Sequence, residues 1–151
     1  MGFVWRPAIP TDDDAIASMC IALNVDDPGL VPVSSDQVGR TLVKLREEPG
    51  RGRAVVCEMG ETIVGYALLI SFWSNEFGGE VLHVDELFID ESHRGHGLAT
   101  NLLERLVQET SLWFPKPVAL ALEVSPTNHR ARMLYERFGF RGNNMAMSRR
   151  L

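Results

Sequence analysis

The sequence has little of three features that would each define a class of protein. Only two cysteines, Cys20 and Cys57, occur among its 151 residues, and they lie far apart and outside any CxxC or Cys/His spacing. We therefore expect reduced thiols in a cytoplasmic protein, with no disulfide framework. The longest apolar run, Val64 to Trp73, is too short to cross a bilayer, so no membrane association is expected.

Positive charge is also scarce. Fifteen lysines and arginines stand against twenty acidic residues, which gives a formal net charge of −5. With no basic stripe in the sequence, nucleic acid is not an expected partner. The four histidines are not spaced like metal ligands, so we expect no metal. An acidic surface is consistent with cationic substrates such as amines.

What is present is the composition of an ordinary globular domain. The chain is 45% hydrophobic and 23% charged, and its length suits one domain over residues 1–151. Apolar periodicity and turn residues predict the element order β-α-α-β-β-β-α-β-α-β. The expected strands are Phe3 to Arg6, Ala54 to Met59, Thr62 to Phe72, Val81 to Ile89, Lys116 to Val124 and Phe140 to Arg149. The expected helices follow Thr11, Ser34 or Ser35, Gly97 and Asn128, and a loop is expected from Asn24 to Val33.

The turn between Val81–Ile89 and the next helix has a pattern that suits anion binding. Gly95 and Gly97 permit a tight turn, and apolar residues recur at four-residue steps from Leu98 onward. The first amides of a helix lack internal partners and carry partial positive charge, to which Arg94 adds a full one. The turn could therefore hold a phosphate, although an ordinary strand-to-helix turn fits the same residues. The pattern matches neither a Walker loop nor a dinucleotide fingerprint.

Several short motifs occur together at a spacing typical of one family. Arg94-Gly95-His96-Gly97-Leu98-Ala99 resembles the pyrophosphate loop of the GCN5-related N-acetyltransferases (GNAT family). Glu86-Leu87-Phe88-Ile89 resembles the family's fourth strand. Glu123-Val124, Asn128, Leu134-Tyr135 and Gly139-Phe140 resemble its fifth strand and following helix. The resemblance covers the whole chain and is more specific in the second half.

The resemblance implies a fold, a cofactor and a set of contacts. The fold is α/β (α+β), with a mixed, mostly antiparallel sheet of 6–7 strands, about four helices, and parallel fourth and fifth strands that splay apart. Acetyl-CoA is the expected co-substrate, its pantetheine arm lying in the gap between those strands. The expected cofactor-binding residues are Leu87, Phe88, Ile89, Arg94, Gly95, His96, Gly97, Leu98, Ala99, Thr100, Asn128 and Tyr135.

Acetyl transfer to an amine needs groups that move protons. A free alkylamine has a pKa of about 10.4, so it must lose a proton before it attacks. Glu86 and Glu123, carboxylates within apolar strands, are candidates for receiving that proton, directly or through water. Tyr135 is the candidate acid for the departing thiolate, two helical turns from Asn128. The alternatives are a solvent-facing or amine-anchoring Glu86, a structural hydrogen bond from Glu123 and a core tyrosine.

The acceptor is expected between the first two helices and the turn from Phe72 to Gly79. Aromatic and acidic residues cluster there in the sequence, namely Trp73, Glu76, Phe77 and Asp85. Such a mixture suits a small cationic amine, although a packed hairpin end would look the same. The alternatives are an acetyltransferase of peptide or protein N-termini, a regulatory CoA-binding module with little turnover, and a nucleotide-phosphate binder. By analogy with the family, the chain could form a homodimer.

Overall fold

The computed structural model describes residues 2–142 and 145–151 of the chain. Its strands are β1 (Val4–Pro7), β2 (Gly52–Met59), β3 (Thr62–Ser74), β4 (Gly79–Ile89) and β5 (Ala119–Leu122). Its helices are α1 (Asp13–Asp26), α2 (Ser35–Glu47), α3 (Leu98–Gln108) and α4 (His129–Arg137), with short 3₁₀ turns η1 (Pro10–Asp12) and η2 (Glu91–His93).

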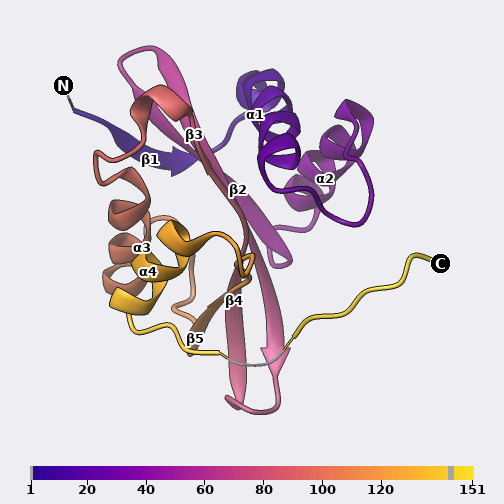
Figure 1. The fold of residues 1–151 in the computed structure, drawn as a ribbon, viewed down its shortest axis with the longest axis vertical. Coiled ribbons are helices and arrows are strands. Elements are labelled where there is room, and N and C mark those ends of the chain that lie inside the picture. The colour runs from indigo at the N-terminus through magenta and orange to yellow at the C-terminus, as the bar shows by residue number, and fades with distance from the viewer. Residues whose placement is uncertain (1, 143–144) are drawn as a thin grey trace.

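The strands form one mixed sheet in the order β1-β2-β3-β4-β5. The first four strands are antiparallel neighbours, whereas β4 and β5 run parallel because α3 connects them as a crossover. Helices α1 and α2 cover one face of the sheet and α3 covers the other (Figure 1). Each face has its own apolar core: Trp5 and Leu102 pack on the α3 side, and Ile16, Leu42 and Tyr66 on the α1–α2 side.

Local sequence explains where several elements begin and end. Ser34 caps α2 through a reciprocal capping box, in which Gln37 N–H donates to Ser34 Oγ and Ser34 N–H donates to Gln37 Oε1. Asn128 caps α4 by accepting a hydrogen bond from Ala131 N–H at 3.2 Å. Gly139 follows α4 with a φ of 87°, the left-handed conformation that ends many helices.

Two sequence predictions about elements are wrong. Helix α1 runs on to Asp26, so the start of the loop expected from Asn24 is helical. The strand expected from Phe140 to Arg149 is absent from the residues described there, and the described sheet has five strands instead of six or seven. Met145 and Met147 are 83% and 89% exposed, so alternating apolar residues here lack a surface to pack against.

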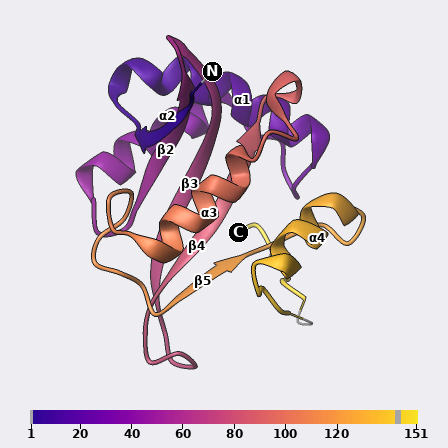
Figure 2. The same ribbon diagram turned by 90° about the vertical axis from the view of Figure 1, so that its left-hand side faces the viewer.

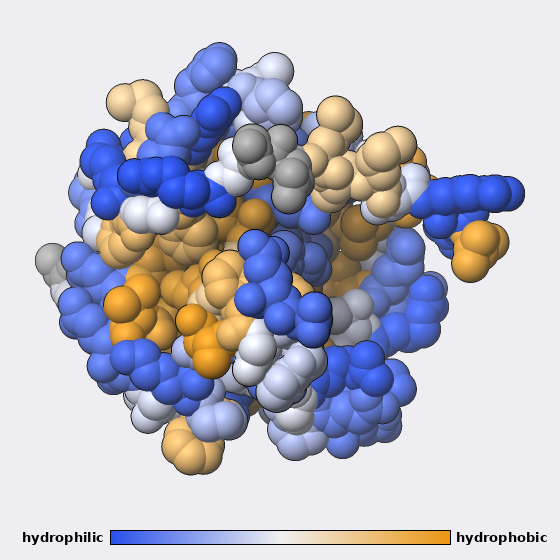
Figure 3. All heavy atoms as spheres, turned by 90° about the horizontal axis from the view of Figure 1, so that it is seen from below, coloured by the Kyte–Doolittle hydropathy of each residue, from blue (hydrophilic) through white to orange (hydrophobic). Residues whose placement is uncertain are grey.

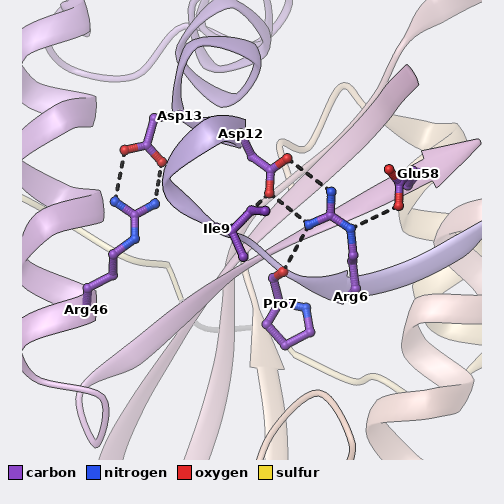
Figure 4. Close-up of polar contacts among 7 residues, drawn as sticks. All are labelled: Arg6, Pro7, Ile9, Asp12, Asp13, Arg46 and Glu58. Carbon is purple, nitrogen blue, oxygen red and sulfur yellow. Dashed lines mark hydrogen bonds and ion pairs between the residues drawn. The ribbon is translucent and has the colours of Figure 1, made fainter. Parts of the chain in front are cut away.

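An ion-pair cluster fastens the first strand to the start of α1 (Figure 4). Arg6 donates to both carboxylate oxygens of Asp12, at 2.8 and 3.1 Å, and to Glu58 on β2 at 3.0 Å. Asp12 is 5% exposed and also accepts from Ile9 N–H at 2.8 Å. The Arg6 hydrogen bonds hold the pKa of the Asp12 carboxyl below its usual value. Three segments that are separate in the sequence are thereby joined.

The hairpin of β3 and β4 extends well beyond the rest of the sheet (Figure 1). Phe72, Trp73 and Phe77 are 45%, 67% and 57% exposed near its turn. Seen from this end, the molecule exposes a broad apolar area among polar side chains (Figure 3). In the part of the chain that the structure describes, no helix is long and apolar enough to span a membrane.

Candidate functional site

Strands β4 and β5 separate partway along their length. Their parallel pairing covers only Val81 to Val84 against Ala119 to Leu122. Strand β5 then ends, whereas β4 continues to Ile89. Figure 2 shows β5 and α4 diverging from β4 beyond the paired segment. The parting expected from the sequence is confirmed, and it opens a wedge between β4 and β5, the last strand in the order of the described sheet.

A cavity of about 550 Å³ occupies this wedge. One wall comes from β4, through Val84 to Leu87, and the opposite wall from Leu122 to Ser125. Tyr135 of α4 and residues 27–31 of the α1–α2 loop also line it. The structure therefore brings Glu86, Glu123 and Tyr135, the three predicted catalytic residues, to one cavity.

A β-bulge sets the direction of the Glu86 side chain. Leu69 pairs with Val84 and Leu68 pairs with Glu86, so Asp85 is an extra residue in β4. An extra residue reverses the alternation of side chains between the two faces of a strand. Val84 packs in the α3-side core, and after the bulge Glu86 points to the α1–α2 side. Asp85 is exposed and lines the wedge.

Glu86 is held by two donors on that side. Tyr66 of β3 donates to Glu86 Oε1 at 2.8 Å, and Cys20 Sγ of α1 lies 3.4 Å from the same oxygen. Burial, reinforced by the Glu86 charge, raises the pKa of the Tyr66 phenol above its usual value. Burial likewise raises the pKa of the Cys20 thiol to about 11. Both groups stay protonated at neutral pH, so both can donate to an ionised carboxylate.

The other two candidates differ in exposure. Glu123 is exposed just beyond the end of β5. Tyr135 is half-buried, its ring packs edge-on against Phe140 at 6.0 Å between centroids, and burial raises the pKa of its phenol. The Tyr135 hydroxyl is therefore protonated at neutral pH, which a proton donor requires.

Beyond its pairing with β5, β4 offers a free main-chain edge to the wedge. In an antiparallel pair, the polar groups of successive residues point alternately toward and away from the neighbouring strand. Asp90 N–H donates to Val64 O on β3 at 2.8 Å, so the groups of Phe88, two residues earlier, also point to β3. The main chain of Leu87 and Ile89 therefore faces the gap, and that of Phe88 does not.

Arg94 turns back onto the end of this edge. Its Nε donates to Ile89 O at 2.8 Å, and its Nη2 donates to Asp26 at the end of α1 at 3.2 Å. The guanidinium also lies 5.3 Å from the centre of the Phe88 ring. The positive charge of Arg94, which the sequence suggested for binding a phosphate, is thus paired in part with Asp26. The Ile89 carbonyl already accepts a hydrogen bond from Arg94.

The glycine-bearing turn has the geometry of an anion cradle. Gly95 and Gly97 have φ values of 80° and 79°, which favour glycine, and Gly97 is the residue before α3. The first intrahelical hydrogen bond runs from Asn101 N–H to Gly97 O, so the amides of residues 98–100 have no partner within the helix. The first turn of α3 contains no acidic residue to compete for them.

The structure adds two residues that the sequence reasoning missed. Arg130 of α4 lies over the turn, because a Cβ added to Gly95 would be 3.3 Å from Arg130 Nη2. Tyr66 reaches the site from β3, and in the sequence nothing distinguishes it from other apolar residues of that strand. The alternating apolar pattern of β3 carried no sign of a hydrogen bond to Glu86, which is twenty residues away. Only the packing of β3 on β4 reveals it.

Other predicted residues lie elsewhere or serve the fold. The Asn128 side chain caps α4. His96 Nδ1 lies 3.2 Å from His93 O within the turn. Trp73, Glu76 and Phe77 lie near the hairpin turn and do not line the wedge cavity, so Asp85 is the only one of the four predicted acceptor residues found there.

Comparisons with known proteins agree with this geometry. A possible acetyltransferase from Clostridium difficile 630 has a TM-score of 0.76 at 19% identity, covering 99% of this chain and 97% of its own. A predicted acetyltransferase with acetyl-CoA from Clostridium acetobutylicum has a TM-score of 0.75 at 17% identity, covering 99% and 96%. A ribosomal-protein-alanine N-acetyltransferase from Brucella melitensis biovar Abortus 2308 has a TM-score of 0.69 at 17% identity, covering 99% of both chains.

These identities are low enough that the three likenesses concern the fold alone. No curated protein sequence matches the chain. The family assignment comes instead from the sequence, in which residues 17–140 match the acetyltransferase (GNAT) family. That match covers most of the chain and both walls of the wedge, and the protein therefore belongs to the acetyltransferase (GNAT) family.

Proposed function

We propose that this protein transfers the acetyl group of acetyl-CoA to a primary amine. The observation that carries the proposal is the position of Glu86, which lines the wedge between β4 and β5 together with Tyr135. A proton acceptor and a proton donor thus border one cavity at the point where a thioester and an amine would meet.

The chain offers complementary groups to each part of acetyl-CoA. The amides of residues 98–100, with Arg130 nearby, suit the pyrophosphate. The free main chain of Leu87 suits the amide groups of the pantetheine arm, which would pair with β4 as a further strand does. The Leu87 N–H also faces the gap, where it can stabilise negative charge on the thioester oxygen.

Glu86 and Tyr135 divide the proton transfers. An ammonium acceptor loses its proton to Glu86, directly or through water, and the neutral amine attacks the thioester carbon. Tyr135 then donates a proton to the departing thiolate, whose pKa is about 8.5. The second proton, which the nitrogen loses as the amide forms, returns to the Tyr135 oxygen through water, and Glu86 releases the first proton to solvent. Glu123 on the opposite wall is exposed, which suits attraction of a cationic acceptor better than proton abstraction.

Release of free thiol from acetyl-CoA tests the proposal. The wild type should release CoA in the presence of at least one class in a panel of alkylamines, polyamines, aminoglycosides and peptide N-termini. Glu86→Gln and Tyr135→Phe should each lower kcat by roughly 100-fold while acetyl-CoA binding, followed by calorimetry, changes less than threefold. The control is Glu136→Gln, because Glu136 is exposed on α4 and pairs with Arg132.

Binding without turnover would identify a different kind of protein. If acetyl-CoA binds and no amine causes CoA release above hydrolysis, the chain is a CoA-binding module. If ATP or NAD binds more tightly than acetyl-CoA, the chain binds nucleotide phosphates instead. Either result refutes the transferase.

A further inference from the structure

A second cavity lies behind Glu86, between α1 and α2. Its volume is about 190 Å³. Cys20, Val33 and Glu86 line both this cavity and the wedge, so they form the boundary between the two. Beyond that boundary the second cavity is lined by Ile16, Gln37, Val38, Thr41, Leu42 and Leu68.

Most of the side chains that line this second cavity are apolar. Glu86 is its one charged lining residue, and Ile16, Val38, Leu42 and Leu68 are buried core residues. Two polar side chains of α2 also line it. Gln37 Oε1 accepts from Ser34 N–H and the Thr41 hydroxyl donates to Gln37 O at 3.0 Å, which leaves the Gln37 amide nitrogen as the neutral polar group of α2 available to the cavity. The cavity therefore favours a hydrocarbon group over a polar one.

We propose that this second cavity holds the apolar arm of the acceptor, so that the substrate is a monoamine whose ammonium meets Glu86 and whose neutral arm lies between α1 and α2. The inference rests on the proposed transfer to an amine and narrows its substrate class. An apolar cavity of about 150 Å³ can hold benzene, so this one has room for a short alkyl chain or a phenyl ring.

The same geometry disfavours diamines and polyamines. A diamine with its first nitrogen at Glu86 would bury its second ammonium among aliphatic side chains, where no second carboxylate lines the cavity. An unpaired buried ammonium is strongly unfavourable. The carboxylates of Asp27, Asp85 and Glu123 line the wedge instead, on the other side of the boundary.

A matched pair of substrates isolates this effect. Pentylamine and 1,5-diaminopentane have the same chain and differ by the terminal ammonium. With wild-type protein and acetyl-CoA, kcat/KM should rise from ethylamine to pentylamine, by up to about fourfold for each buried methylene. Benzylamine should also be accepted, and pentylamine should exceed 1,5-diaminopentane at least tenfold.

Two variants change the cavity in opposite senses. Thr41→Met fills it and should reduce the pentylamine-to-ethylamine ratio at least fivefold. Val38→Ala enlarges it and should raise the benzylamine-to-pentylamine ratio, a gain that loss of folding cannot produce. Val43→Met is the matched control, because Val43 lies on the same helix and is 50% exposed. It should keep the wild-type ratios. Melting temperature and acetyl-CoA binding confirm that each variant is folded.

Preference for 1,5-diaminopentane, or ratios unchanged in both cavity variants, would overturn the inference and leave the transferase standing. Absence of CoA release with every amine, despite acetyl-CoA binding, would refute the transferase itself and the acceptor cavity with it.

Discussion

The Tyr66 hydroxyl of β3 donates a 2.8 Å hydrogen bond to the carboxylate of Glu86 on β4. The two residues are not directly paired across the strands, since Tyr66 lies opposite Phe88 and Glu86 opposite Leu68. Tyr66 is fully buried, so its hydroxyl is fixed by packing, and in turn it fixes one oxygen of the carboxylate. The second oxygen of Glu86 is left for the wedge and for an incoming amine.

Tyr66→Phe should impair the reaction without unfolding the protein, because it removes only the hydroxyl from a packed ring. Loss of a hydrogen bond to a charged group is worth about 1.5–3 kcal/mol, so kcat should fall by roughly 10-fold or more. An unchanged kcat would mean that Tyr66 serves packing alone.

Gly97→Glu should block the cofactor by placing a carboxylate at the start of α3. Any side chain at Gly97 is strained because its φ is 79°, although a Cβ there would meet no atom within 4 Å. Gly97→Gln has nearly the same bulk and the same strain without the charge, and is the control. Calorimetry should show acetyl-CoA binding at least tenfold weaker for Gly97→Glu than for Gly97→Gln. Melting should show Gly97→Glu no less stable than Gly97→Gln, since a carboxylate is favourable at a helix N-terminus. Equal binding by the two variants would contradict the cradle.

Arg130→Ala should weaken binding of acetyl-CoA several-fold at low ionic strength. The guanidinium lies over the turn at Gly95, and the loss should shrink as salt screens the exposed charge. Arg132→Ala removes the same charge from the same helix and is the control, because Arg132 pairs with Glu136. Binding of S-acetylpantetheine, which lacks the nucleotide phosphates, should be the same in both variants. A comparable loss with this ligand would indicate that Arg130 only supports α4.

Asp12→Asn should destabilise the protein at pH 7 by about 2 kcal/mol, because it weakens charged hydrogen bonds from Arg6. The Arg6 hydrogen bonds lower the pKa of Asp12, so the stabilisation is present above the unfolded value of about 3.9. It is lost as the pH falls through the lower folded value. Urea unfolding between pH 7 and pH 2 should therefore show a smaller acid loss in Asp12→Asn than in the wild type. Asp14→Asn, at an exposed neighbouring position, should behave like the wild type, and an equal effect there would exclude a specific role for the cluster.

Several features of this protein follow from its sequence because they depend on neighbouring residues. The capping box at Ser34, the glycines at 95 and 97 and the apolar periodicity after Leu98 each specify a local conformation whatever the rest of the chain does. The connection through α3 makes the flanking strands parallel, and their separation was predicted from the resemblance to the family. The strand expected near the C-terminus failed because alternation alone does not provide a partner to pack against.

The tertiary structure decided what could not be obtained from neighbours in the chain. The bulge at Asp85 exists only in the pairing of β4 with β3, and it alone turns Glu86 toward Tyr66 and Cys20. The positive charge of Arg94 can be read from the sequence, but its hydrogen-bond partners cannot. Arg94 bonds to Ile89 O and to Asp26, and the contact with Asp26 depends on where α1 ends. Side-chain direction, hydrogen-bond partners and cavities are properties of elements packed together, so residue types determined the family and packing determined the site.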